Sequence, residues 1–514
     1  MRAVDQSARD TAIDPTKSFC VSAPAGSGKT ELLTQRLLAL LARVERPEQV
    51  LAITFTRKAA SEMSIRLLEK LEQARMGTPI TAEHERHTRQ LATNLLAHAE
   101  QRQWRLDQTT LNIRTIDSLC HELTRQMPIL SGLGGLVEAV DNAQPLYEEA
   151  VSEFLSQAGE GDVGRRIIQL LAHFDNRWSK VSELLVAMLG RRGDWGQLIQ
   201  TGQDPAAAEA VISATMRDLS AHRIANIAHQ LGADLNALLD AVNKAREHLE
   251  EPPLTLTHDV ESLSDWQAMV RWLLTSQFEW RKPGGINAKL GFPPKSPHKA
   301  TFVSVLESIS GNEALREALI DLAHLPLLDS DIGAWERVVL VASLLPVLQA
   351  HLLLVFQRSG AVDHTHIALA AIQALGSDEY PTGLAQRVDY QLEHILVDEF
   401  QDTSASQAEL LRRLMRGWEE HNASGAAPRT VFVVGDAMQS IYGFRYADVS
   451  LFLKAMRGQL AGVSLEPLTL TQNFRSRPEV VSWVNDRFSS LFAGEDDPSF
   501  GRVKHVQADA IAVE

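Results

Sequence analysis

The segment Ala23-Pro24-Ala25-Gly26-Ser27-Gly28-Lys29-Thr30 stands between a short apolar run, Phe19–Ser22, and a leucine-rich stretch, Glu31–Leu38. A strand followed by a glycine-rich loop and a helix is the context in which many proteins bind phosphate groups. Gly26 and Gly28 let the backbone approach the anion, so that N–H groups and the N-terminus of the next helix face it. The segment therefore predicts a phosphate-binding loop.

The side chains of this loop have separate expected roles. Lys29 would reach the β and γ phosphates of a nucleotide, and Thr30 would ligate Mg²⁺. The first glycine of the usual pattern is replaced by Ala23, but the glycines, lysine and threonine that contact phosphate are kept. We therefore predict that the nucleotide is held by Ala23, Pro24, Ala25, Gly26, Ser27, Gly28, Lys29 and Thr30.

An acidic pair far along the chain gives a second, independent signal. The apolar run Ile395–Val397 ends in Asp398 and Glu399. At the end of a buried strand, Asp398 would hold Mg²⁺, and Glu399 would orient and deprotonate the water that attacks the γ-phosphate. The alternative is a solvated turn or a helix start, and Ser404 with Gln407 has the spacing of a capping box. The combination with the phosphate loop favours phosphoryl transfer to water.

The order of the expected elements indicates the fold. Short β-branched runs occur near both ends of the chain, and each precedes a helix-like segment, which predicts an α/β fold with a parallel sheet covered on both faces. In the middle, leucines and alanines recur every three or four residues, as in helices. We expect residues 1–141 and 388–514 to form the α/β domain and residues 142–387 to form a mostly α-helical insertion. The predicted strands are Ser18–Ala23, Gln49–Thr54, His394–Asp398, Thr430–Gly435 and Pro467–Thr471.

Two stretches of the insertion need separate interpretation. Val338–Phe356 is apolar but is interrupted by polar residues and by Pro346, which predicts a pair of buried helices broken at the proline rather than a membrane span. Arg281–Gly285 and Phe292–Lys299 are rich in proline, glycine and basic residues and are expected to be loop. Their lysines either contact phosphates or are simply solvated.

Composition narrows the class of protein. The 514 residues suffice for several domains, and 45% hydrophobic with 22% charged residues is typical of soluble globular proteins. A net charge of −15 excludes coating of nucleic acid by bulk charge but allows a local basic groove. Cys20 and Cys120 cannot form a disulfide framework, and the N-terminus lacks the apolar region of a secretory signal. We expect a cytoplasmic protein without a membrane span.

Further motifs follow the phosphate loop in a fixed order. They are Ile53-Thr54-Phe55-Thr56-Arg57-Lys58-Ala59-Ala60-Ser61-Glu62-Met63, Thr115-Ile116-Asp117-Ser118-Leu119-Cys120, Val397-Asp398-Glu399-Phe400-Gln401-Asp402-Thr403-Ser404, Val434-Gly435-Asp436-Ala437-Met438-Gln439-Ser440-Ile441-Tyr442-Gly443-Phe444-Arg445 and Thr471-Gln472-Asn473-Phe474-Arg475-Ser476. Together they resemble the motifs of the superfamily 1 helicases of the UvrD and Rep type, most closely the RecB and AddA-like helicase–nuclease branch. The resemblance implies a P-loop RecA-like domain with a large helical insertion, which binds ATP and Mg²⁺ and couples ATP hydrolysis to 3′-to-5′ movement on DNA in repair or recombination.

The resemblance also implies roles for single residues. Gln439 would sense the γ-phosphate and couple it to DNA, Arg475 would act as the arginine finger, and Phe474 would stack on adenine. On the DNA side, aromatic rings would stack on bases of any sequence, and polar residues would hold the backbone or the aromatic gate. The stacking residues would be Phe55, Tyr442 and Phe444, and the polar ones Thr54, Thr56, Lys58 and Arg445.

The chain departs from the family pattern at several positions. The adenine-reading glutamine should precede the phosphate loop, where Gln6 lies slightly too far away and Arg9 lies nearer, so both stay open. Glu31 stands where arginine is frequent, and Asp117 stands where histidine is frequent. These changes affect the preference for a nucleotide and the contacts with DNA.

The motifs of a second motor domain and of a nuclease domain do not occur in the 514 residues. The resemblance therefore implies that a second RecA-like domain comes from the rest of a longer polypeptide or from a partner subunit. The alternative function is a nucleotide-dependent single-strand-binding or regulatory module, or a split-gene fragment, without motor activity of its own. A P-loop kinase or GTPase fits less well, because it leaves the Gln439 and Arg475 motifs unexplained and no guanine-reading Asn-Lys-x-Asp stretch occurs.

Overall fold

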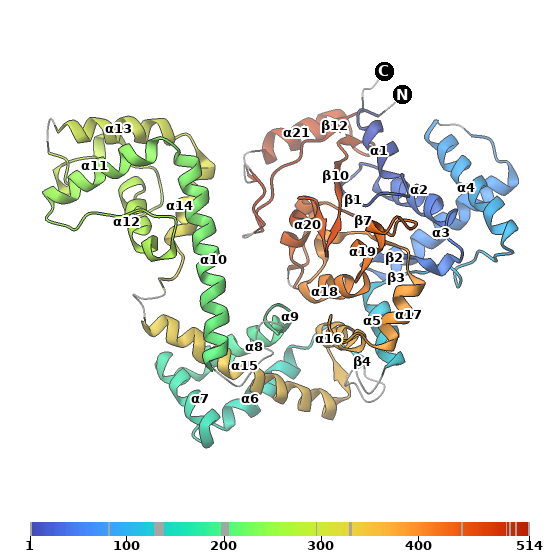
Figure 1. Cartoon of the computed structure of the whole chain (residues 1–514), viewed down its shortest axis with the longest axis horizontal. Helices are drawn as coiled ribbons and strands as arrows, with labels where there is room; N and C mark the ends of the chain where they lie inside the picture. The colour runs from blue at the N-terminus through green and yellow to red at the C-terminus, as the bar shows by residue number, and fades with distance from the viewer. Residues whose placement is uncertain are drawn as a thin grey trace. The chain divides into compact units, whose positions relative to one another are not determined.

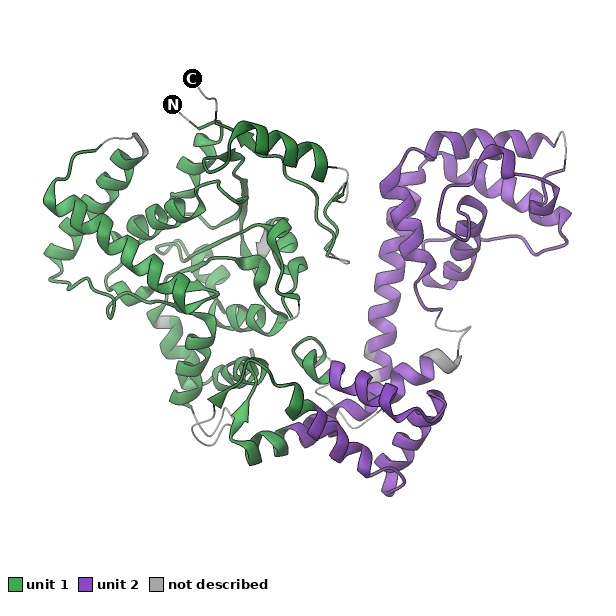
Figure 2. Ribbon diagram, turned by 180° about the vertical axis from the view of Figure 1, so that it is seen from behind, with its two compact units in different colours: residues 1–147, 189–195, 353–514 green, residues 148–188, 196–352 purple. Residues whose placement is uncertain are grey.

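The computed structural model describes residues 3–80, 83–127, 138–196, 205–293, 296–327, 332–443, 446–489, 491–492, 495–498 and 501–511. The chain divides into two compact units (Figure 2). The first contains residues 1–147, 189–195 and 353–514, and the second contains residues 148–188 and 196–352. The boundaries of the helical insertion predicted from the sequence, at residues 141 and 387, stay predictions.

The first unit is built on a six-stranded parallel sheet (Figure 1). Its strand order is β10-β1-β7-β6-β2-β3, so β1 from the N-terminal part of the chain lies between β10 and β7 from the C-terminal part, and β6 pairs with β2. The predicted α/β fold is confirmed, and all five predicted strands are present; β3 was not predicted. The strands are β1 (Phe19–Ser22), β2 (Val50–Thr54), β3 (Ile113–Thr115), β6 (His394–Val397), β7 (Thr430–Gly435) and β10 (Glu466–Thr469).

The central strands are apolar at nearly every position because both faces of the sheet are covered. Val21, Leu396 and Phe432 pack into one core together with residues of α2. Their neighbours Cys20 and Ile395 point to the opposite face and are also buried. Since all strands run in the same direction, the loops that follow β1, β2, β3, β6, β7 and β10 leave the sheet at one edge.

Helices and short strand pairs complete the first unit. The short pairs are β4 (Glu138–Ala139) with β5 (Ala361–Val362), β8 (Gln459–Leu460) with β9 (Val463–Ser464), and β11 (Gln472–Asn473) with β12 (Asp509–Ala510). The helices are α1 (Gln6–Ala12), α2 (Lys29–Leu41), α3 (Arg57–Met76), α4 (Glu83–Gln101), α5 (Ile116–Gln126), α9 (Arg192–Trp195), α16 (His364–Leu375), α17 (Gly383–Gln391), α18 (Ala405–Leu414), α19 (Trp418–Ala423), α20 (Val449–Ala455) and α21 (Pro478–Phe488).

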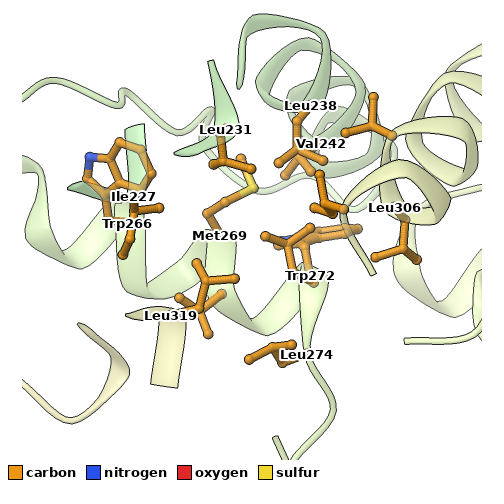
Figure 3. Close-up of a cluster of buried hydrophobic side chains, with 14 of the residues drawn as sticks. Ile227, Leu231, Leu238, Val242, Trp266, Met269, Trp272, Leu274, Leu306 and Leu319 are labelled. Atoms are coloured by element: carbon orange, nitrogen blue, oxygen red, sulfur yellow. The ribbon is translucent and has the colours of Figure 1, made fainter. Parts of the chain in front are cut away.

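The second unit is helical, as its leucine and alanine spacing predicts. Figure 3 shows part of its core, in which Met269 lies among aliphatic and tryptophan side chains. Trp266 is buried, and its indole N–H donates to the carbonyl oxygen of Thr257 at 2.9 Å. The helices within this unit are α7 (Gly161–His173), α10 (Pro205–Leu231), α11 (Asp234–His248), α12 (Leu263–Leu273), α13 (Pro297–Ile309) and α14 (Glu313–Ala323); α6 (Gln144–Ser156), α8 (Trp178–Gly190) and α15 (Ile332–Ser359) run from one unit into the other.

Helix α15 corrects the prediction of two helices broken at Pro346. The helix is continuous from Ile332 to Ser359 with Pro346 inside it. A proline inside a helix removes one hydrogen bond and costs about 3 kcal/mol. Burial of Leu344, Leu345 and Leu348 on adjacent turns offsets that cost. By length and composition alone this helix is also apolar enough to cross a bilayer, and 39% of its apolar window is buried inside the protein.

The two proline-rich, basic stretches of the insertion, Arg281–Gly285 and Phe292–Lys299, were predicted to be loop. The structure corrects this prediction in part. Pro283–Gly285 and Ala288–Leu290 form single 3₁₀ turns, and α13 begins at Pro297, so that His298 and Lys299 belong to a helix. Proline is well suited to the first position of a helix because its missing N–H would be unpaired there. The residues between 293 and 296 lie outside the described part of the chain.

A buried ion pair explains why residues 189–195 belong to the first unit. The Arg192 guanidinium is 1% exposed and pairs with Asp363, which precedes α16. The hydroxyl of Tyr147 donates to the same carboxylate. Although burial favours the neutral acid, Arg192 holds the pKa of Asp363 below its usual value. The buried ion pair between Arg192 and Asp363 therefore attaches the short helix α9 to the first unit.

A second buried guanidinium orders the chain before β1. Arg36 of α2 is fully buried and donates to the carbonyl oxygens of Ala12, Asp14 and Lys17. Its Cζ lies 5.4 Å from each of two ring centroids, those of Phe19 and Phe432. Burial lowers the pKa of Arg36 to about 9, so the group stays charged at neutral pH. One side chain thus satisfies the carbonyls of the segment that leads from α1 to the sheet.

We expect Arg36→Leu to destabilise the first unit by about 3 kcal/mol, because buried carbonyl groups lose their hydrogen-bond donors. Urea denaturation followed by circular dichroism measures the change. Arg43→Leu is the matched control, since Arg43 lies just beyond the same helix and is not buried. Equal stability of the two variants would contradict the role assigned to Arg36.

Candidate functional site

The phosphate loop lies at the edge of the sheet where β1 ends. Gly26 and Gly28 have φ values of +82° and +78°, a conformation that favours glycine. Ala23 N–H donates to the carbonyl oxygen of Gly435 in β7 at 2.8 Å, which fixes the start of the loop. Within the described residues, the amides of Gly26, Gly28, Lys29 and Thr30 donate no hydrogen bond to the protein. Such unpaired amides at a helix N-terminus suit an anion.

The segment after β10 holds this loop from outside. Asn473 Nδ2 donates to the carbonyl oxygen of Ala25 at 3.1 Å, and the amide of Phe474 donates to the carbonyl oxygen of Gly26 at 2.8 Å. Asn473 Oδ1 in turn accepts from the amide of Arg475 at 2.9 Å. Phe474, 49% exposed, and Arg475 are thereby positioned beside the phosphate loop. The sequence did not predict that Asn473 would form a hydrogen bond to the phosphate loop.

Lys29 faces the acidic pair that follows β6. Its Nζ lies 2.6 Å from Glu399 Oε1 and 3.8 Å from Asp398 Oδ1. Glu399 has a φ of +53°, and its amide donates to Asp398 Oδ1 at 2.9 Å, so the two carboxylates are turned toward the loop. Burial raises the pKa of Asp398 to about 6, and Lys29 opposes the rise. The structure brings together the predicted cation and the predicted acidic pair.

A chain of polar contacts links Glu399 to Gln439. Gln401 Nε2 donates to Glu399 Oε2 at 2.8 Å, while Gln401 Oε1 accepts from the amide of Asp436 at 3.0 Å. The Asp436 carboxylate then accepts from Gln439 Nε2 at 2.6 Å. The predicted Gln439 is therefore connected to Glu399 through two residues that sequence analysis did not single out. Ser404 and Gln407 form the expected capping box at the start of α18, separate from the acidic pair.

The residues present fit a nucleotide and a magnesium ion. Ser27 Oγ is buried in the loop and lacks a hydrogen-bond partner among the described residues, as expected of a group that awaits a ligand. No cluster of three or more metal-ligating side chains occurs in the described part of the chain. Mg²⁺ needs no such cluster, because it takes one or two protein ligands and completes its shell with phosphate and water. Thr30 and Asp398 would hold it.

A groove of about 950 Å³ lies near the other end of the same sheet edge. It is bounded by the residues that follow β2, by β3 and α5, by the end of β4 and by the start of α16. Phe55 lines this groove, and its ring lies against that of Tyr442, which is far away in sequence, with centroids 4.6 Å apart. Three arginines contribute to its lining, namely Arg57, Arg114 and Arg125. An aromatic pair beside basic side chains suits a single nucleic-acid strand.

Carboxylates in this groove lie beside an arginine and a histidine. Glu122 pairs with Arg114. His364 Nδ1 lies 3.3 Å from Asp117 Oδ2, and His364 Nε2 lies 3.2 Å from Asp141 Oδ1. Asp117 and Asp141 raise the pKa of His364 above its usual value. Asp117 stands where histidine is frequent in the family pattern. In this structure it lies beside a histidine from a distant segment, His364.

The remaining predicted nucleic-acid contacts are less exposed or less well placed. Thr54 is buried, and its hydroxyl donates to the carbonyl oxygen of Thr56 at 3.1 Å. The hydroxyl of Thr56 caps α3, and Lys58 is exposed beside Glu62. Phe444 and Arg445 lie outside the described residues. Their roles stay predictions, and Thr54 orders the loop in this structure rather than presenting its side chain.

The structure separates the two candidates for reading the base. Gln6 Nε2 donates to Asp10 Oδ1 at 2.8 Å. Arg9 instead reaches the phosphate loop, with its Cζ 5.0 Å from the centroid of the Phe474 ring. Glu31, which replaces a frequent arginine, accepts from the hydroxyl of Thr88 at 2.6 Å. Arg9 thus lies beside Gly28 of the phosphate loop, and which of the two residues reads the base stays a prediction.

A parallel sheet with a phosphate loop after β1 and an acidic pair after β6, with β7 between the two strands, defines a P-loop protein of the RecA-like class. Comparison with known proteins gives the particular family. The chain belongs to the UvrD/REP helicase N-terminal domain family, whose model matches residues 4–274 and 291–458. This confirms the resemblance noted from the motifs. Phe474 and Arg475 lie beyond the matched residues.

Curated relatives are named as one component of an ATP-dependent helicase/nuclease. The proteins from Desulfitobacterium hafniense (strain DSM 10664 / DCB-2) and Staphylococcus aureus (strain USA300 / TCH1516) are each 26% identical to this chain over 95% of its length. That of Exiguobacterium sibiricum is 25% identical over the same share. The chain spans 36%, 39% and 40% of these three relatives, respectively.

We expect Gly26→Ala to weaken nucleotide binding by roughly a hundredfold, because a Cβ there would lie 2.7 Å from Asn473 Oδ1 and 3.0 Å from Arg475 Cβ. Fluorescence titration with a labelled nucleotide measures the loss. Gly77→Ala is the control, since Gly77 also has a positive φ but open space around it. That variant should lose about 1 kcal/mol of stability and keep its affinity. Unchanged nucleotide binding by Gly26→Ala would contradict the close contact of Asn473 and Arg475 with the phosphate loop.

Proposed function

We propose that this chain is the N-terminal ATP-binding motor domain of a DNA helicase that moves 3′ to 5′ along a single strand in repair or recombination. One observation carries the proposal: Lys29 of the phosphate loop contacts Glu399, while Asn473 holds Phe474 and Arg475 against the same loop. Family membership and the names of the relatives support it. The polarity rests on the family resemblance alone.

The contacts suggest how the site turns over ATP. Lys29 would leave Glu399 for the β and γ phosphates when the nucleotide arrives, because phosphate oxygens then provide the stronger negative charge. Glu399 would thereby be free to orient and deprotonate the attacking water. Mg²⁺, held by Thr30 and Asp398, would neutralise charge on the phosphates. Arg475 would stabilise the charge that develops on the γ-phosphate.

Coupling to DNA would use the polar chain from Glu399 to Gln439. Gln439 lies three residues before Tyr442, whose ring packs on Phe55. A change in the contacts of Glu399 during hydrolysis would pass through Gln401 and Asp436 to this aromatic pair. The rings would then release one base and take the next, since stacking requires no particular sequence.

Movement along DNA requires a partner domain. In the mechanism implied by the family, ATP closes a cleft between two RecA-like domains. The chain spans 36–40% of the relatives named above, and we propose that a second RecA-like domain is supplied by the rest of a longer polypeptide or by another subunit. By itself this chain would bind ATP and single-stranded DNA and hydrolyse ATP slowly. Both cysteines are free and buried, which suits the proposed cytoplasmic location.

We expect Lys29→Ala to abolish ATP hydrolysis and Glu399→Gln to reduce it by about a thousandfold while leaving ATP binding intact. Steady-state turnover with Mg²⁺, with and without a single-stranded oligonucleotide, tests both. Lys17→Ala serves as the control, because Lys17 is exposed and pairs only with Glu466 among the described residues. Turnover that survives in Lys29→Ala would rule out the phosphate-loop assignment, and DNA stimulation in the parent chain would show a coupled motor site.

We expect affinity for single-stranded DNA to fall as pH rises through the raised pKa of His364. Deprotonation removes the cation and leaves Asp117 and Asp141 uncompensated in a groove for a polyanion, which costs about 1 kcal/mol or roughly fivefold in affinity. His364→Ala should bind weakly at every pH. Asp117→Asn combined with His364→Ala should recover most of the affinity, because one charge of each sign is removed. Fluorescence anisotropy at constant salt measures all three, and full affinity in His364→Ala would refute the pairing.

A further inference from the structure

The turn that carries Tyr442 ends near a residue with an unusual backbone conformation. Tyr446 has a φ of +62°, which is disfavoured for a bulky side chain. Its amide donates to the carbonyl oxygen of Gly443 at 3.0 Å, and the amide of Ala447 donates to the carbonyl oxygen of Tyr442 at 3.3 Å. These two hydrogen bonds close the turn. A strained conformation of this kind persists only where surrounding contacts hold it, so the contacts of the Tyr446 side chain matter.

Gly190, at the end of α8, makes room for the side chain of Tyr446. A Cβ on Gly190 would collide with the Tyr446 hydroxyl oxygen, and it would lie 2.7 Å from Cζ and 3.3 Å from Cε1 of the same ring. Gly190 is buried in a helix and does not have a positive φ. Alanine is ordinarily more favourable than glycine at such a position. The contact with the tyrosine ring, rather than the backbone conformation, therefore explains why a glycine fits here.

The same short stretch of chain also holds the start of α16. Arg192, two residues after Gly190, forms the buried ion pair with Asp363. Asp363 immediately precedes His364, which lines the groove. Burial raises the pKa of the Tyr446 hydroxyl above its usual value, and the Asp363 carboxylate adds to the rise, as expected of a ring beside this ion pair. The end of α8 and the start of α9 therefore contact both the turn of the aromatic pair and the helix that begins at the groove.

We propose that Tyr446 is a positioning residue for single-strand binding, because its ring, packed on Gly190, holds the ring of Tyr442 against Phe55. The proposal rests on the proposed function, since it requires that this aromatic pair contact DNA. Tyr446 acts through the closed turn and does not itself stack on a base. Because α8 runs from the second unit into the first, a segment of the inserted sequence thereby contributes to the binding of the strand.

Gly190→Ala is the first test, because the added methyl group displaces the Tyr446 ring while alanine itself favours the helix. We expect the Kd of the full chain for a fluorescein-labelled single-stranded oligonucleotide to rise by about tenfold, since stacking on aromatic rings supplies much of such affinity. Fluorescence anisotropy measures the change. Gly193→Ala in α9 is the matched control, because its Cβ would lie at an ordinary distance of 3.5 Å from Ser406 Oγ and Thr365 Cγ2. The DNA affinity of the control should equal that of the parent chain.

Nucleotide affinity separates a positioning role from general loss of structure. A fluorescent nucleotide should bind Gly190→Ala with the same Kd as the parent chain, because residues 23–30 do not contact the altered position. The DNA concentration that gives half-maximal stimulation of ATP turnover should rise by the same factor as the Kd for DNA. An equal loss of nucleotide affinity and DNA affinity would show that Gly190→Ala only disturbs the fold, and it would overturn the proposal.

Tyr446→Gly is the second test, since glycine adopts a positive φ without strain and removes the ring. The variant should remain folded and bind the oligonucleotide about tenfold more weakly. Adding Gly190→Ala to it should cause no further loss, because the methyl group then meets no ring. Full DNA affinity in both single variants, or losses that multiply in the double variant, would overturn the proposal. A parent chain that binds no single-stranded DNA would instead remove the proposed function, and this inference with it.

Discussion

The site depends on strand β1 being held between two strands that come from the far end of the chain. Phe19–Ser22 pairs with Phe432–Gly435 of β7 on one side and with Glu466–Thr469 of β10 on the other. The phosphate loop leaves β1 at the point where both neighbours also end. Its shape is therefore set by residues far along the sequence, and the intervening helical insertion must return the chain to the same sheet.

This arrangement explains how much the sequence could predict. The phosphate loop, the acidic pair and five strands are local patterns, in which spacing and residue type suffice. The position of Asn473 on the loop could not be predicted, because its contact with Ala25 joins segments that only the sheet brings together. For helix α15 the local pattern was misleading. Pro346 predicted a break, but the helix is continuous because burial of the neighbouring leucines offsets the cost of the proline.

Two of the departures from the family pattern lie near side chains from other segments. Glu31 stands where arginine is frequent, and Arg9 of α1 lies beside Phe474 and the glycine Gly28 of the phosphate loop. Asp117 stands where histidine is frequent, and His364 of α16 lies 3.3 Å from it. The sequence alone did not predict these neighbours, because they are far apart along the chain.

The ion pair of Arg192 with Asp363 has a consequence for how the two units are joined. Because residues 189–195 belong to the first unit, the backbone crosses between the units four times, after residues 147, 188, 195 and 352. A shortened chain that omits residues 148–352 would also lose Arg192 and leave Asp363 buried without a cation. The helical unit is thus not a detachable module on a single pair of linkers, and the RecA-like unit depends on the inserted sequence for part of its own interior.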